Sequence, residues 1–171
     1  MPAASPKTVV VLVGPKGSGK TFIGQLASEA LGVHFLRVEP IFLENMRRSR
    51  LTGVAQEAEG YREVRARADA ALRAEPRVVI ESTGASTAFP AFLDALRSAY
   101  EVKLVAIRAP LDRCLERVRT RDRTDHIPAS DKRVEEINAR AVAVALPWDL
   151  EIDNGGPAPA ETILRQLRAV L

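Results

Sequence analysis

The sequence contains one cysteine, few aromatic residues and no long hydrophobic run, and each of these absences argues against a class of protein. A single cysteine, Cys114, cannot form a disulfide within the chain, which is typical of a reducing compartment, so we expect a cytoplasmic location. No apolar run approaches the length of about 18 residues that a membrane-spanning helix needs, so we expect no membrane association. Residues 1–7 lack the charged-then-apolar pattern of a signal peptide and are predicted to form a flexible tail.

The charge is nearly balanced: 25 Lys and Arg residues against 22 Asp and Glu residues give a formal net charge of +3. Arginines concentrate between residues 108 and 140, where they would suit either a nucleic acid or a small anionic compound. Aromatic residues, on which single strands stack, make up only 5% of the chain and are absent from that stretch. The composition therefore favours a small-molecule partner and leaves nucleic acid as the less favoured one.

The segment from Gly14 to Thr21 matches the pattern G-x-x-x-x-G-K-[ST] of a phosphate-binding loop (P-loop). Its glycines let successive backbone N–H groups approach an anion, and the loop leads into a helix N-terminus, which favours negative charge. Lys20 would reach the β- and γ-phosphates of a nucleotide, and the Thr21 hydroxyl would bind Mg²⁺. The β-branched run 8–13 before the loop predicts a buried parallel strand, and 22–31 after it predicts a helix. The residues predicted to bind the nucleotide are Gly14, Pro15, Lys16, Gly17, Ser18, Gly19, Lys20, Thr21 and Phe22.

The rest of the chain alternates between predicted strands and helices. With 171 residues and no linker or repeat, we expect one domain over 8–171. Alternating strands and helices favour a parallel sheet that is covered on both faces. Beyond the first strand and helix, strands are predicted over 33–38, 76–81, 102–107 and 150–153, and helices over 41–50, 56–74, 89–99, 111–121, 131–146 and from 159 onward.

The chain resembles the small P-loop kinases of the shikimate kinase-like and nucleoside monophosphate kinase-like kind. The likeness rests on the P-loop, the run Ala30–Phe35, the step Tyr61-Arg62-Glu63, the segment Leu115–Val118 and the run Glu151–Asn154. It implies a three-layer α/β fold with a five-stranded parallel sheet in the order 2-3-1-4-5. It also implies a mobile lid, at about 119–130, and a substrate-binding helical region after the second strand.

The same resemblance implies roles for individual residues. Arg117 would pack on adenine, and Asn154 and Gly155 would border it. Arg62 and Arg140 would bind the substrate. A lid arginine would act on the transferred phosphoryl group, and Arg123, or alternatively Arg121, holds that position.

The chain departs from the shikimate kinase pattern at two places that contact the substrate. Arg37 and Glu39 stand where shikimate kinases have two acids at the end of the second strand. Ser82, Thr83 and Gly84 replace a triple-glycine loop after the third strand, and we expect them to contact the acceptor. These differences favour kinase chemistry on an acceptor other than shikimate.

Two acids are candidates for the catalytic carboxylate. Glu81 ends the third predicted strand, where it could hold a metal-bound water or orient the acceptor hydroxyl. Glu39 follows the second strand and is the alternative base, because ligands of parallel sheets bind at the carboxyl ends of the strands. The sequence does not distinguish between them.

The sequence thus predicts an ATP- and Mg²⁺-dependent kinase that transfers the γ-phosphoryl group to a small hydroxyl- or phosphate-bearing acceptor. The predicted catalytic residues are Lys20, Glu39, Glu81 and Arg123, and Thr21 and Glu81 are the predicted metal ligands. Two alternatives remain: an ATPase or switch that works through a partner, and a kinase of nucleosides, nucleotides or nucleic-acid ends. Either a monomer or a homodimer is compatible with the sequence.

Overall fold

A computed structural model describes residues 6–156 and 159–171. In this part of the chain, parallel strands form one sheet in the order β2-β3-β1-β4-β5, which confirms the predicted order 2-3-1-4-5. Most of the predicted tail, residues 1–5, lies outside the described residues. The strands are β1 (Thr8–Val13), β2 (His34–Leu36), β3 (Arg77–Ser82), β4 (Glu101–Arg108) and β5 (Leu150–Asp153).

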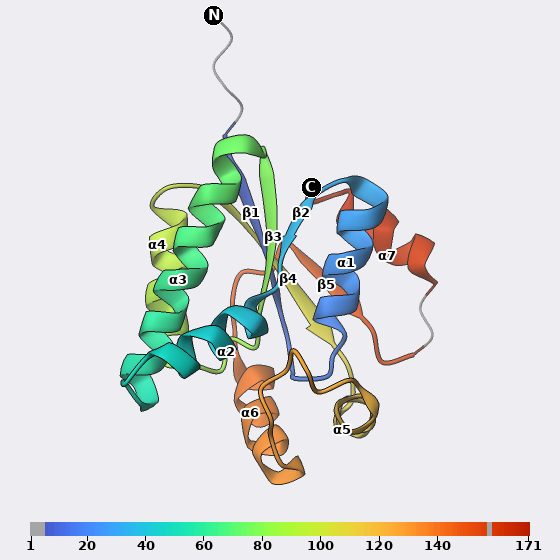
Figure 1. The fold of residues 1–171 in the computed structure, drawn as a ribbon. Coiled ribbons are helices and arrows are strands. Elements are labelled where there is room, and N and C mark those ends of the chain that lie inside the picture. Colours follow the sequence, from blue (N-terminus) through green and yellow to red (C-terminus); the bar gives the residue numbers. More distant parts are fainter. Residues whose placement is uncertain (1–5, 157–158) are drawn as a thin grey trace, which may run out of the picture.

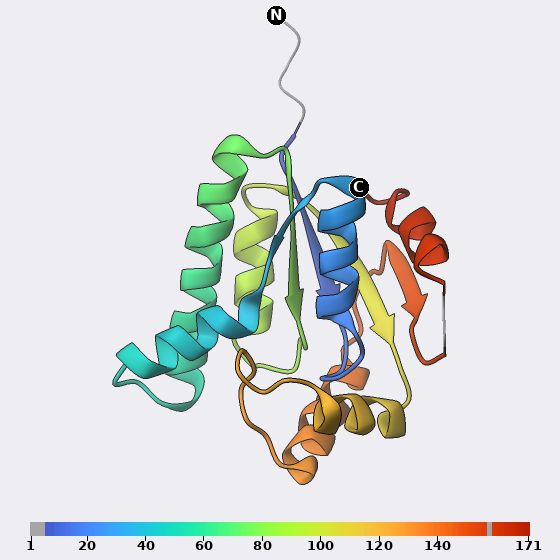
Figure 2. The same cartoon turned by 45° about the vertical axis from the view of Figure 1, so that its right-hand side comes forward.

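Helices cover both faces of the sheet, and further helices lie beyond the carboxyl ends of its strands. Their bounds are α1 (Lys20–Leu31), α2 (Val38–Arg48), α3 (Gly53–Ala74), α4 (Phe89–Arg97), α5 (Leu111–Thr120), α6 (Asp131–Ala143) and α7 (Ala160–Leu167). Helices α3 and α4 lie on one face, and α1 and α7 on the other (Figure 1). Below the arrowheads of the strands lie α5 and α6 (Figure 2). None of the helices in the described part of the chain is both long and apolar enough to cross a membrane.

The central strand β1 holds the two layers together because its side chains alternate between them. Val9, Val11 and Val13 pack with the buried residues of α3 and α4. Val10 and Leu12 pack instead with the buried residues of α1 and α7. Successive side chains of a strand point to opposite faces, so a continuous apolar run is what a strand buried on both sides requires.

The segment after β2 differs from the prediction. The strand covers only His34–Leu36, not 33–38, and α2 begins at Val38 rather than at residue 41. Glu39 and Pro40 therefore lie in the first turn of a helix instead of at the end of a strand. Proline is tolerated there because the first-turn N–H groups have no partner within the helix. An acid in the same turn interacts favourably with the helix dipole.

Candidate active site

The P-loop connects β1 to α1. Two of its positions must be glycine because nearby atoms leave no space for a side chain. Gly17 and Gly19 have φ angles of 85° and 96°, in the left-handed region that favours glycine. A Cβ atom on Gly17 would overlap the backbone of Cys114, and one on Gly19 would overlap the side-chain amide of Asn154. The loop therefore keeps its conformation only if both positions lack a side chain.

One side of the P-loop is braced by β5 and α5. The buried amide Nδ2 of Asn154 donates to the Ser18 carbonyl at 2.8 Å. The Arg117 guanidinium donates to the carbonyls of Gly17 and Ser18, both at 3.3 Å, and to that of Asn154 at 2.7 Å. Arg117 lines the cavity described below, whereas Asn154 lies behind the loop and does not. Asn154, which was predicted to border adenine, contacts the loop backbone.

The other side of the P-loop is held by Asn138, a residue that the sequence analysis did not single out. Its Oδ1 accepts from the Lys16 N–H at 2.7 Å, and its Nδ2 donates to the Lys16 carbonyl at 3.1 Å, both in the protein interior. Asn138 lies on the face of α6 that also buries Val134 and Ala141. A polar residue at a buried apolar position was the available signal, because such a group is retained only when it is hydrogen-bonded.

Lys20 and Ser18 present buried polar groups that an anionic ligand would stabilise. Lys20 Nζ donates to the carbonyls of Gly14 and Pro15, both at 2.8 Å, and burial lowers the pKa of Lys20 to about 8. The buried Ser18 hydroxyl has no hydrogen-bond partner in the described part of the chain. An unpaired buried hydroxyl and a buried cation are both stabilised by an anion, so the loop fits a phosphate chain.

The two residues predicted to bind a metal meet at the start of α1. Thr21 Oγ1 donates to Glu81 Oε2 at 2.9 Å, and Glu81 is only 6% exposed at the carboxyl end of β3. Lys20 lies close enough to interact electrostatically with this carboxylate. A hydroxyl and a carboxylate beside a phosphate site form an oxygen donor set that fits Mg²⁺. Thr21 and Glu81 are the two residues that the sequence analysis predicted as metal ligands.

Glu39 forms the centre of a network that links the P-loop, α2 and the predicted lid. Its Oε1 accepts from Lys16 Nζ at 2.7 Å. Its Oε2 lies 2.6 Å from His126 Nδ1, accepts from the Ile127 N–H at 3.3 Å and lies 4.0 Å from the Arg121 guanidinium. Burial opposes ionisation, but the Lys16 charge and hydrogen bond outweigh it and hold the pKa of Glu39 below its usual value. Both carboxylate oxygens are thus engaged by the protein itself.

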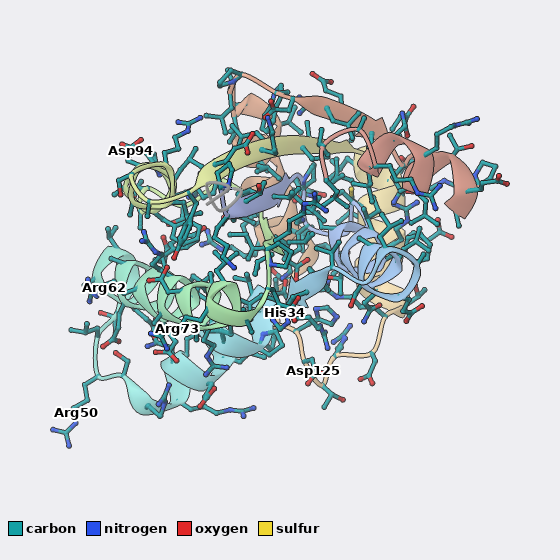
Figure 3. All side chains as sticks on the ribbon, turned by 90° about the horizontal axis from the view of Figure 1, so that it is seen from above. His34, Arg50, Arg62, Arg73, Asp94 and Asp125 are labelled. Carbon is teal, nitrogen blue, oxygen red and sulfur yellow. The ribbon has the colours of Figure 1, made fainter. Side chains whose placement is uncertain are left out.

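The connection between α5 and α6 covers one side of the site and carries both candidate lid arginines. Arg121 is half-buried and lines the cavity, and burial lowers its pKa. Arg123 is exposed and does not line it. Of the two candidate lid arginines, Arg121 is therefore the one that faces the cavity. Asp125, which Figure 3 places on this connection, pairs with Arg37 at 3.1 Å and so links the connection to the residue between β2 and α2.

A cavity of about 690 Å³ runs from the P-loop to the space between α2 and α3. Among the residues predicted to contact the acceptor, Glu39, Ser82, Thr83 and Arg140 line it. Phe22, predicted to contact the nucleotide, lines it as well.

Three further residues that were predicted to contact the nucleotide or the acceptor do not line the cavity. Arg62 is exposed on α3 and lines a separate groove together with Arg48; Figure 3 shows it at the outer edge of that helix. Gly84, with φ 70°, turns the chain beneath the cavity without lining it. Gly155 does not line the cavity either and packs against Pro110.

This sheet order and this loop define the class of P-loop nucleotide-binding proteins. The chain belongs to the AAA domain family, whose sequence model matches residues 9–144. No curated protein sequence gives a significant match.

Solved structures of kinases share the fold. A sugar kinase from Janibacter sp. is 21% identical, with 95% of this chain and 92% of that one covered and a TM-score of 0.67. A gluconokinase from Sinorhizobium meliloti is 18% identical, with coverages of 98% and 93% and a TM-score of 0.64. A chain of the Pnkp1/Rnl/Hen1 RNA repair complex is 17% identical over 83% of this chain and 46% of its own, with a TM-score of 0.64. The predicted resemblance to small P-loop kinases is thereby confirmed at the level of the fold.

Proposed function

We propose that the protein is an ATP-dependent kinase that transfers the γ-phosphoryl group to a small hydroxyl- or phosphate-bearing acceptor. The observation that carries the proposal is the placement of Lys20 and the Thr21–Glu81 pair at one end of a cavity of about 690 Å³. The rest of that cavity is free to hold an acceptor. Phosphoryl transfer depends mainly on positioning and on charge stabilisation, and this arrangement provides both.

Each residue has a role in this proposal. Lys20 exchanges its two carbonyl partners for phosphate oxygens, and the P-loop N–H groups hold the remaining charge. Thr21 and Glu81 would hold Mg²⁺, which, when bound, neutralises charge on the phosphates. Arg121 faces the same space from the lid and stabilises charge on the transferred group. Glu81 is the better candidate for orienting the acceptor hydroxyl, because both oxygens of Glu39 are already engaged.

A kinase of nucleic-acid ends is the second candidate. Exposed Arg133 and Arg140 lie on the α6 face that lines the cavity, where they could contact a phosphate backbone. The fold likeness to a chain of an RNA repair complex points in the same direction. This candidate predicts phosphorylation of an oligonucleotide that weakens steeply as the salt concentration rises.

The test is ATP consumption by the purified protein with Mg²⁺ and a panel of small hydroxyl compounds, with an oligonucleotide included. We expect acceptor-dependent formation of ADP that Lys20→Ala abolishes. Lys132→Ala is the matched control, because Lys132 is exposed and lies outside the cavity lining. Glu81→Gln should lower kcat by about 10²–10⁴-fold if Glu81 acts in the transfer. An active Lys20→Ala variant, or hydrolysis that no acceptor changes, would contradict the proposal.

A further inference from the structure

The end of the cavity away from the P-loop has an apolar side, formed by α2 and α3. We call this side the apolar wall, and its residues are Val38, Phe42, Met46, Val54 and Tyr61. The Phe42 ring meets the Tyr61 ring edge-on, with centroids 5.1 Å apart, and Tyr61 stacks on Phe92 in the core behind it. Aromatic packing against the core therefore holds the side chains of the apolar wall in place.

Two side chains of the apolar wall are exposed to solvent. Met46 is 42% exposed and Val54 is 60% exposed, although both line a cavity. Concave sites lined by apolar side chains are where small molecules bury their own apolar surface. An acceptor with an apolar body would cover Met46 and Val54 and remove that surface from water.

The apolar wall offers little to a compound with many hydroxyl groups. The Tyr61 hydroxyl is already hydrogen-bonded to Ser82 Oγ at 2.9 Å, and burial raises the pKa of Tyr61 to about 12, so the hydroxyl stays neutral. A polyol that is taken out of water needs a partner for each hydroxyl, and an unpaired one weakens binding. Beside the apolar wall, uncharged polar groups come from Gln56 of α3 and from Thr83, Ser86 and Thr87 on the loop after β3.

The charges around this end of the cavity also argue against an acidic acceptor. Arg62 of α3 faces a different groove, and Arg37, which precedes α2, pairs with Asp125. Within the described residues, Glu57 is the one charged side chain that α3 contributes to the cavity lining. Glu57 Oε2 accepts a hydrogen bond from Ser86 Oγ, which fixes the carboxylate beside the apolar wall. The arginines of the lining come from α5, α6 and the connection between them: Arg117, Arg121, Arg133 and Arg140.

From this juxtaposition we infer that the acceptor is a hydroxyl compound with an apolar body and, next to Glu57, a cationic amine. This inference rests on the kinase activity proposed above. The acceptor oxygen would bond to the γ-phosphorus of ATP while the bond from that phosphorus to the β,γ-bridging oxygen breaks. The hydroxyl proton is released, and the products are ADP and a phosphate monoester of the acceptor.

The experiment compares phenylethanolamine and phenylethanol with glucose, gluconate and shikimate as acceptors. ATP binding without any acceptor is measured separately by calorimetry. We expect kcat/KM for phenylethanolamine to exceed that for each polyol or acid by at least about tenfold. Glu57→Gln should reduce the preference for phenylethanolamine over phenylethanol by about tenfold, because the amine loses a charged partner.

Two variants of the α2 region separate the apolar wall from general effects. Met46→Gln keeps the length of the side chain but adds a polar end, and should raise the KM for phenylethanolamine about tenfold while the KM for ATP stays unchanged. Arg50→Gln is the control, since Arg50 is exposed and outside the cavity lining, and Figure 3 shows it at the tip of the α2–α3 connection.

The outcomes separate the inference from the function on which it rests. If ATP does not bind, the proposed kinase function fails. If ATP binds and glucose, gluconate or shikimate is the preferred acceptor, the kinase proposal survives and the acceptor class is refuted. If ATP binds and none of the five compounds is phosphorylated, the acceptor class is refuted, and the wider panel described above decides the kinase proposal. An unchanged KM for phenylethanolamine in Met46→Gln would refute the apolar wall as its contact surface.

Discussion

Replacing Glu39 by glutamine should destabilise the protein, because it removes the charge on which the network between the P-loop and the lid depends. The side chain of Lys16 is only 7% exposed and that of Glu39 is 25% exposed, so the pair is shielded from water on one side. The Glu39→Gln substitution keeps the size and a carbonyl oxygen but leaves the Lys16 ammonium without a counter-charge. Loss of a hydrogen bond to a charged group costs about 1.5–3 kcal/mol, and we expect about 2 kcal/mol because Glu39 keeps some contact with water.

Thermal unfolding at neutral pH measures this cost, with an expected fall in Tm of about 4–8 °C for a chain of this size. The pH dependence gives a second readout. The pKa of Glu39 is lower in the folded protein than its usual value of 4.5, so its stabilising effect is complete above that value. The effect is lost as the pH falls through the folded pKa. The difference in the free energy of unfolding between wild type and Glu39→Gln should therefore be largest at neutral pH and should disappear in acid.

A double-mutant cycle with Lys16→Met tests the cause of the loss. If the Lys16 pair is responsible, Glu39→Gln should cost much less in the Lys16→Met background than in wild type, with a coupling of about 0.5–3 kcal/mol. Activity adds a separate check, because a general base would cost about 10²–10⁴ in kcat, whereas a positioning residue should leave kcat within about tenfold. A stability within about 0.5 kcal/mol of wild type, or equal costs in both backgrounds, would refute the reasoning.

Two further substitutions test the lid and the loop. Arg121→Ala should lower kcat by about 10²-fold because its guanidinium faces the phosphate end of the cavity, whereas Arg123→Ala should change it by no more than about twofold. Equal losses in steady-state assays of the two variants would contradict the proposed role of Arg121. Gly19→Ala should cost about 1–3 kcal/mol in chemical unfolding, because φ is 96° and a Cβ would overlap the Asn154 amide. Gly156→Ala, with no heavy atom close to the added Cβ, is the control, and equal stability of the two variants would show that the loop tolerates a side chain.

The sheet and the P-loop could be predicted because their signals are local. The run of β1 and the spacing of glycines in the loop each point to one structure. The start of α2 was missed because the sequence around Pro40 is compatible with both the end of a strand and the first turn of a helix. That Arg62 lies outside the cavity was not evident from the sequence, and the reason is its rotational position on α3. Tyr61 faces the core, and the next residue of a helix lies about 100° further round its axis, so Arg62 points away from the cavity.

The contacts that fix the P-loop come from parts of the chain that no local motif connects. Asn154 contacts it from the residue after β5, Asn138 from α6 and Glu39 from α2, at sequence separations of up to 136 residues. Glu39 binds the loop through Lys16 and the lid through His126 with the two oxygens of one carboxylate. A phosphate that drew Lys16 toward itself would weaken the first of these contacts and so change what Glu39 offers to the second. Glu39 therefore connects the P-loop to the connection between α5 and α6, which gives this acid a structural role without requiring it to accept a proton.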